Sequence, residues 1–181
     1  MNEQHYLPPL FEPRSVAIIG ATERENSLGN VLVRNMLEAG FKGKLFAVNP
    51  KYDQVFGVPC YKSVEDIPQR LDLVVITTKA DRVPAIVDAC GRAGTKAAVV
   101  IPSGFADAGP RGKMLEKNTV ENARRHRIRL LGPNCLGVLR PELGLNASFA
   151  RGGAIKGSIG LISQSGALCS AILDWARPNN V

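Results

Sequence analysis

Cysteines are few in this sequence, and no two of them stand close together. The chain has 181 residues, of which only four are cysteines (Cys60, Cys90, Cys135, Cys169) and two are histidines (His5, His126). No Cys-x-x-Cys pair is present. These absences exclude a zinc site and a disulfide framework, so we expect no metal and reduced, mostly buried thiols.

Long apolar runs are lacking as well. The longest covers about six residues around 97–102, far below the roughly 18 residues of a membrane span. The first eleven residues, MNEQHYLPPLF, lack the basic region and continuous apolar stretch of a signal peptide. We therefore expect a cytoplasmic protein with no membrane partner.

The composition is otherwise that of a folded domain. Hydrophobic residues make up 45% and charged residues 22%, and the net charge is +7, which excludes disorder as the main state. The segment from Arg111 to Arg129 contains seven basic residues but only two acidic ones, Glu116 and Glu121. Because aromatic residues are absent from this segment, we interpret it as a solvated helix face and expect no nucleic-acid partner.

Short apolar runs alternate with helical patterns along most of the chain. The pattern predicts strands at 15–20, 44–48, 71–77, 96–101 and 129–131, and helices at 28–39, 64–67, 82–92 and 110–125. Continuous Val/Ile/Leu runs indicate strands covered on both faces, and strands separated by helices must be parallel. The prediction is an α/β, Rossmann-like, doubly wound parallel sheet over residues 10–140.

Beyond this sheet the rhythm changes. Residues 141–157 are rich in glycine and small side chains and are expected to form a connection. Residues 158–162 are predicted as a further strand, followed by a turn and a helix to Ala176. This strand–helix unit either extends the first sheet or begins a second, truncated domain over 158–181, which is the favoured interpretation.

The stretch between the first strand and the first helix is a candidate anion site. Gly20, Ala21 and Thr22 leave the strand, and Ser27, Leu28 and Gly29 open the helix. Unpaired N–H groups and the helix dipole favour a phosphate there. The spacing departs from Gly-x-Gly-x-x-Gly and is too long for the tight pyrophosphate turn of a nicotinamide site. A glycine-bounded loop can also merely connect two elements.

The end of the second strand carries a lysine where a nicotinamide site places an acid. Asn49 and Pro50 form a turn, and Lys51 follows. A lysine favours a ribose that bears a phosphate, as in coenzyme A or the phosphorylated nicotinamide cofactor. The alternative is a solvated surface lysine after a turn proline.

Three other strand ends face the same edge of the predicted sheet. Their candidate binding residues are Thr77 and Thr78, then Ile101, Pro102 and Ser103, and finally Asn134. Cys135 is interpreted as a buried thiol rather than a nucleophile, because no histidine stands near it in sequence. Residues 163–166 (Ser-Gln-Ser-Gly) do not match a nucleophile elbow and fit a helix-start anion site better.

Six segments carry a family resemblance: SVAIIGAT (15–22), SLG (27–29), AGFKG (39–43), AVNP (47–50), LLGPNCLG (130–137) and ISQSG (162–166). Together they resemble the CoA-binding domain of nucleoside-diphosphate-forming acyl-CoA synthetases, relatives of the succinyl-CoA synthetase alpha subunit. The segments GLNASF (144–149) and ILDWA (172–176) look more like the branch fused to a GNAT acetyltransferase domain, the Pat-type protein lysine acetyltransferases.

The resemblance implies coenzyme A or acetyl-CoA as the ligand. It places the CoA phosphates over Thr22, Ser27, Leu28 and Gly29. Lys51 then corresponds to the family lysine near the nucleotide. Thr77 and residues 101–103 line the rest of the CoA site. Lys79 departs from the proline that many synthetases have before the third helix. It also implies that residues 158–181 begin a flavodoxin-like domain, and that the family's phosphorylatable histidine lies beyond Val181, because neither His5 nor His126 matches it.

The expected function is a CoA- or acyl-CoA-binding module that positions CoA in a synthetase or senses it in an acetyltransferase. The chain alone is not expected to catalyse turnover, and it is a possible homo-oligomer with a small-molecule CoA thioester and downstream domains as partners. Two alternatives stay open: an NADP-binding oxidoreductase domain, and a stand-alone nucleotide-sensing protein.

Overall fold

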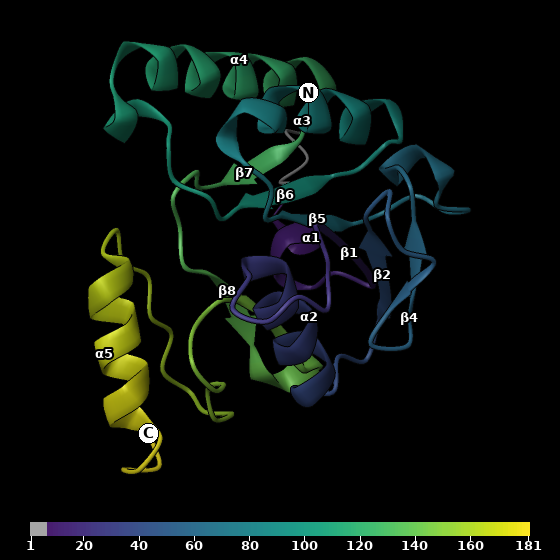
Figure 1. The fold of residues 1–181 in the computed structure, drawn as a ribbon. Helices are drawn as coiled ribbons and strands as arrows, with labels where there is room; N and C mark the ends of the chain where they lie inside the picture. Colours follow the sequence, from purple (N-terminus) through teal and green to yellow (C-terminus); the bar gives the residue numbers. More distant parts are fainter. Residues whose placement is uncertain (1–6) are drawn as a thin grey trace, which may run out of the picture.

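A seven-stranded sheet forms the centre of the computed structural model, which describes residues 7–181 (Figure 1). Residues 1–6, His5 among them, lie outside this range. The strand order is β3-β4-β2-β1-β5-β6-β7. In chain order the strands are β1 (Ser15–Ile19), β2 (Lys44–Val48), β3 (Gln54–Val55), β4 (Val58–Tyr61), β5 (Leu73–Ile76), β6 (Ala97–Val100) and β7 (Arg129–Leu131).

Six of these strands run parallel, and only the edge strand β3 is antiparallel to its neighbour β4. All residues of β1, β5 and β6 are buried, which explains why their sequences are continuous apolar runs rather than alternating ones. The sheet confirms the predicted doubly wound α/β fold. The pair β3–β4 lies in a stretch where no strand was predicted.

Helices cover the two faces of the sheet, as Figure 1 shows. The α-helices are α1 (Pro8–Phe11), α2 (Leu28–Glu38), α3 (Val83–Arg92), α4 (Pro110–His126) and α5 (Gly166–Ala176). Short 3-10 turns are η1 (Val64–Asp66), η2 (Ala80–Arg82), η3 (Ala106–Ala108) and η4 (Pro141–Leu143). None of the helices between residues 7 and 181 is long and apolar enough to cross a membrane.

The alternation of side chains along each strand divides the core into two layers. Val16 and Ile18 of β1 pack with Leu32 and Met36 of α2. The intervening residues of the strand, Ala17 among them, pack on the other face with α3 and α4. A sheet covered in this way has only its strand ends open to a ligand.

A hairpin of β8 (Gly137–Arg140) and β9 (Leu145–Ser148) covers part of α2. The expectation that 141–157 is only a connection is therefore wrong for its first part. All four residues of β9 are buried. The polar members Asn146 and Ser148 are tolerated because they hydrogen-bond to each other, at 2.7 Å between Ser148 Oγ and Asn146 Oδ1, and to nearby backbone. Because β9 consists mostly of small and polar residues, its sequence did not indicate a strand.

Residues 158–162 form no strand, so the predicted strand is wrong here, whereas the helix that follows it is present as α5. A strand needs a neighbouring strand to accept its backbone hydrogen bonds, and nothing in the described chain pairs with this stretch. No residue of α5 is buried. In Figure 1 this helix, in yellow, stands apart from the sheet.

Candidate functional site

The carboxyl ends of the parallel strands meet at one edge of the sheet. In the sheet, β1 has β2 as its neighbour on one side and β5 as its neighbour on the other, so the strand order reverses at β1. This is the topological switch point, where ligands of open α/β sheets bind. The loop between β1 and α2 (residues 20–27), called the first loop below, and the amino terminus of α2 lie at this point.

The start of α2 rests directly on the end of β1. A Cβ placed on Gly29 would lie 2.0 Å from the Gly20 carbonyl oxygen, so only glycine permits this approach. Gly20 has a φ of +92°, a backbone conformation that favours glycine. The sharp exit from β1 and the close seat of the helix both follow from these two residues.

Backbone donors remain free at this helix start. Ser27 is the N-cap of α2: its Oγ accepts from Asn30 N at 3.3 Å and donates to Arg24 O at 2.7 Å. The N–H groups of Leu28 and Gly29 have no acceptor among the described residues. Two free donors and the positive end of the helix dipole can hold an anionic group such as a phosphate.

The first loop is tied to the segment that follows β2 by three hydrogen bonds. Asn49 Nδ2 donates to Ala21 O at 2.8 Å. The Thr22 hydroxyl donates to the Tyr52 oxygen at 3.2 Å, and Phe56 N donates to Glu23 Oε1 at 2.7 Å. These bonds join consecutive residues of the first loop to a segment that was recognised from the sequence only at residues 49–51.

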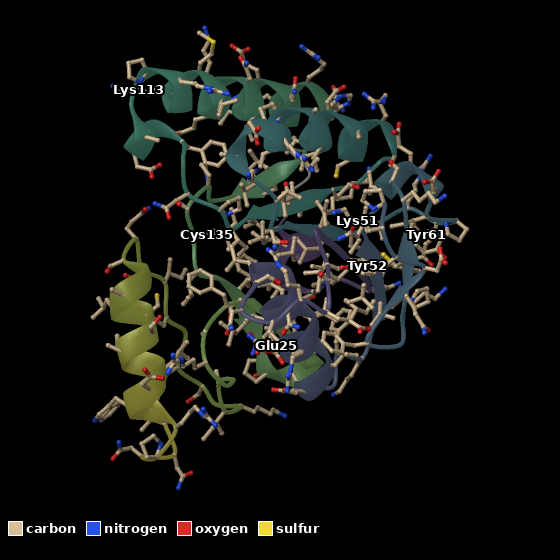
Figure 2. All side chains as sticks on the ribbon, in the orientation of Figure 1. Glu25, Lys51, Tyr52, Tyr61, Lys113 and Cys135 are labelled. Carbon is tan, nitrogen blue, oxygen red and sulfur yellow. The ribbon has the colours of Figure 1, made fainter. Side chains whose placement is uncertain are left out.

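Lys51 lies on this second segment and is exposed. Its N–H donates to Asn49 Oδ1 at 3.1 Å, which fixes the turn through Pro50. In Figure 2, Lys51 and its neighbour Tyr52 lie at the side of the site near β2, and Glu25 lies on the first loop. Lys51 thus follows the carboxyl end of β2, one of the strand ends at which ligands of open α/β sheets bind.

Beyond β5, the two predicted threonines differ in their surroundings. Thr77 Oγ1 donates to Ile19 O at 2.9 Å, which joins the ends of β1 and β5. Thr78 Oγ1 is buried and has no hydrogen-bond partner among the described residues. Its methyl carbon would lie 3.1 Å from a Cβ on Gly20. An unpaired buried hydroxyl beside the first loop is the kind of group that a polar ligand atom can satisfy.

The remaining predicted residues follow β6 and β7. Ile101 is buried, Pro102 is half-buried and Ser103 is exposed. Asn134 N donates to Pro102 O at 3.0 Å, so these two turns touch. All fifteen predicted binding residues thus lie at one edge. Lys51 and Asn134 are not brought together, because β2 and β7 lie four inter-strand spacings apart, or about 19 Å.

Burial keeps the thiol beside this edge in its protonated form. Burial raises the pKa of Cys135 to about 11, and its Sγ lies 3.3 Å from Val100 O. A thiol with this pKa carries almost no thiolate at neutral pH. The structure agrees with the sequence interpretation of Cys135 as a packed thiol. At the start of α5, Ser165 caps the helix by accepting from Leu168 N at 3.2 Å.

Three residues of this site were not found from the sequence. Glu23, Tyr52 and Phe56 hold the first loop against the segment after β2. Their hydrogen bonds join the first loop to the residues that follow the next strand, about 30 residues further along the chain, so no spacing rule points to them. The only signal was the pair of aromatic residues within five positions of Lys51.

Comparisons with known proteins agree with this geometry. The model of the CoA binding domain family matches residues 14–141. The ADP-forming acetate–CoA ligase I of Archaeoglobus fulgidus is 45% identical over 95% of this chain and 25% of that protein. The alpha subunit of the corresponding Pyrococcus furiosus ligase is 41% identical over 93% of this chain and 37% of that subunit.

A solved structure shows the same arrangement of elements. It is the dinucleotide-forming acetyl-coenzyme A synthetase 1 of Ca. Korarchaeum cryptofilum in complex with phosphate and ADP, with a TM-score of 0.91 and 40% identity over 96% of this chain and 37% of that one. The chain thus spans about a quarter to two fifths of the length of these relatives. These relatives are ligases and synthetases, which gives no support to the GNAT-fused branch or to the oxidoreductase alternative. On the match over residues 14–141, the chain belongs to the CoA binding domain family.

Proposed function

We propose that this chain is the CoA-binding part of an ADP-forming acyl-CoA ligase, and that it holds CoA by its phosphates at the edge described above. The observation that carries the proposal is the start of α2, where Leu28 and Gly29 present free N–H groups at the switch point. Ligases of this kind among the relatives, such as the Archaeoglobus enzyme, support the reaction class.

Each part of the edge has a separate role in this proposal. The N–H groups at the start of α2 and the first loop hold the pyrophosphate, because they combine unpaired donors with the helix dipole. Lys51 holds the ribose phosphate through a charge-assisted contact. Thr78, residues 101–103 and Asn134 line the course of the rest of the ligand. Bound in this way, the CoA thiol would be held in place while an acyl phosphate is delivered by other parts of the enzyme.

Calorimetric titration of the chain with CoA, acetyl-CoA and NADPH tests this function. The proposal predicts tight binding of CoA and weak binding of NADPH, because Lys51 and the long first loop suit a ribose 3′-phosphate and not the tight turn of a nicotinamide site. Comparing CoA with acetyl-CoA shows whether the acyl group adds to binding. Millimolar binding of CoA beside tight binding of NADPH would overturn the proposal.

We also propose that residues 158–181 are the first part of a second, flavodoxin-like domain. Apolar side chains are widely exposed in this stretch: Ile159 is 79%, Ile162 96% and Trp175 59% exposed. Soluble domains bury such side chains. A chain shortened to residues 1–157 should keep the unfolding free energy of 1–181 and lose its binding of a hydrophobic dye. A marked loss of stability would show that 158–181 belongs to the first domain instead.

A further inference from the structure

The segment between β2 and β4 carries two aromatic side chains that are not part of the core. Tyr52 is 36% and Phe56 37% exposed. Both follow the end of β2, where the adenosine half of a dinucleotide lies in open α/β sheets. Tyr52 directly follows Lys51, the residue to which the proposed function gives the ribose phosphate, and Phe56 lies in the next turn, between β3 and β4.

Both aromatic residues are fixed to the first loop. The Tyr52 oxygen accepts from the Thr22 hydroxyl at 3.2 Å, and Thr22 itself is buried. Phe56 donates its backbone N–H to Glu23 Oε1 at 2.7 Å. The Tyr52 ring, through its hydroxyl, and the Phe56 backbone are therefore held beside the loop that the proposed function assigns to the pyrophosphate.

The backbone of Phe56 is unusual for a bulky residue. Its φ is +49°, and Gly57 follows at +77° in the turn between β3 and β4. Bulky side chains rarely adopt this conformation, because the Cβ crowds the following carbonyl group. Asparagine or glycine, which usually occupies such turns, would relieve this crowding. The turn itself therefore does not explain an aromatic residue at position 56.

From these observations, and resting on the proposed function, we infer that Tyr52 and Phe56, the aromatic wall of the site, contact the adenine base of CoA. Adenine has two flat apolar faces, and it stacks on aromatic side chains without needing specific hydrogen bonds to them. The wall lies on the same side of the site as Lys51, so base and ribose phosphate would be bound next to each other. The site then selects an adenine nucleotide with a phosphorylated ribose, and not only a phosphopantetheine arm.

Three variants of the chain distinguish the contribution of the aromatic rings to binding from the effects of the backbone conformation at Phe56 and of the Tyr52 hydroxyl. Phe56→Asn removes one ring and keeps a residue that tolerates positive φ. Tyr52→Leu removes the other ring, and Tyr52→Phe keeps the ring and removes only the hydroxyl bonded to Thr22. Thermal unfolding of each variant shows whether it is folded before it is titrated with ligand.

Each variant is titrated with CoA and with 4′-phosphopantetheine, which has no adenosine. We expect Phe56→Asn to bind CoA about 10-fold more weakly than the unaltered chain, and Tyr52→Leu about 10-fold more weakly than Tyr52→Phe, the loss typical of one aromatic–base contact. Within each of these two pairs the affinity for 4′-phosphopantetheine should be the same, because Tyr52→Leu and Tyr52→Phe both lack the hydroxyl bonded to Thr22. Tyr52→Phe should lose less CoA affinity than Tyr52→Leu.

Two results would overturn the inference alone: unchanged CoA affinity in the folded ring-deleted variants, or an equal loss for both ligands, which would mean that the rings act only on the first loop. If the unaltered chain bound no CoA, the proposed function would fail and the inference with it. The two failures are therefore distinguishable in one set of titrations.

Discussion

Gly29 lies so close to Gly20 that a Cβ at position 29 would stand 2.0 Å from the Gly20 carbonyl oxygen. This contact seats the first turn of α2 on the end of β1. It also sets the direction of the N–H groups of Leu28 and Gly29, the donors to which we assign the CoA pyrophosphate.

Gly29→Ala should therefore weaken both folding and ligand binding. The added methyl group meets backbone, which cannot rotate away, so the helix start must shift. We expect a loss of about 1–3 kcal/mol in the free energy of unfolding, the usual cost of overpacking, and weaker CoA binding. Urea unfolding and calorimetry measure the two effects.

Gly157→Ala is the matched control, because nothing lies within 4 Å of a Cβ at that position. It should change neither quantity. If Gly29→Ala behaved like Gly157→Ala in both measurements, the close seat of α2 on β1 would have no role in stability or binding.

Asn35 joins α2 to the β8–β9 hairpin. Its Nδ2 donates to Ser148 O at 2.8 Å and to Ala150 O at 3.1 Å, in a buried position. Asn35→Ala leaves both carbonyl groups without this donor, so we expect a loss of about 1–3 kcal/mol in unfolding free energy. Chemical denaturation measures it.

Arg34→Ala serves as the comparison on the same helix. Arg34 is exposed, and its ion pair with Glu38 spans 3.6 Å at the surface, so its removal should change stability by less than about 0.5 kcal/mol. Equal effects of the two substitutions would contradict a stabilising role for the Asn35 side chain.

The sequence predicted the sheet well because its signals are strong there. Strands β1, β5 and β6 are buried on both faces, so they read as continuous apolar runs. The strands that were missed differ physically. β3 and β4 form a short edge hairpin, and β9 buries asparagine and serine by local hydrogen bonding. Neither arrangement leaves an apolar period in the sequence.

The sequence indicated the parts of the candidate site that lie at strand ends and at the start of α2, but not the contacts between its loops. Gly20, Ser27 and Gly29 follow from the turn and cap that an α/β crossover requires. Tyr52 and Glu23 act through contacts between two loops, and these depend on the tertiary fold. At 158–162 an apolar run predicted a strand that is not formed, because an apolar run forms a strand only where another strand is next to it.

Asp88 links α3 to α4 through its hydrogen bond with His126. It hydrogen-bonds to His126 Nε2 at 2.8 Å and pairs with Arg92 and Arg125. The hydrogen bond from His126 and the nearby guanidinium groups hold the pKa of Asp88 below its usual value. A lowered carboxyl pKa contributes stability that is complete above about pH 4 and is lost as the pH falls through the folded-state pKa.

Asp88→Asn should accordingly destabilise the chain at pH 7, and its difference from the unaltered chain should shrink at pH 3. Denaturant unfolding at both pH values measures this. Glu121→Gln, which removes a surface ion pair with Lys117 at 3.9 Å, is expected to have little effect at either pH. A difference for Asp88→Asn that grew on acidification would contradict the assignment.

The thiols of Cys90, which is buried, and Cys135, which is half-buried, should resist alkylation in the folded chain. Burial raises the pKa of Cys90 to about 12 and that of Cys135 to about 11. Because only the thiolate reacts with iodoacetamide, both should be modified at least about 10-fold more slowly at pH 7.5 than in urea-unfolded chain. Mass spectrometry of timed samples measures both rates. Fast labelling of folded Cys135 would contradict its interpretation as a packed thiol.

In the proposed function, the free amides at the start of α2 and the ammonium group of Lys51 hold two different phosphates of CoA. The most direct measurement compares CoA with 3′-dephospho-CoA in the unaltered chain and in Lys51→Ala. We predict that Lys51→Ala loses about 10-fold or more in affinity for CoA, the size of a charge-assisted contact, and little for the dephospho form. An equal loss for both ligands, or none for either, would contradict the claim.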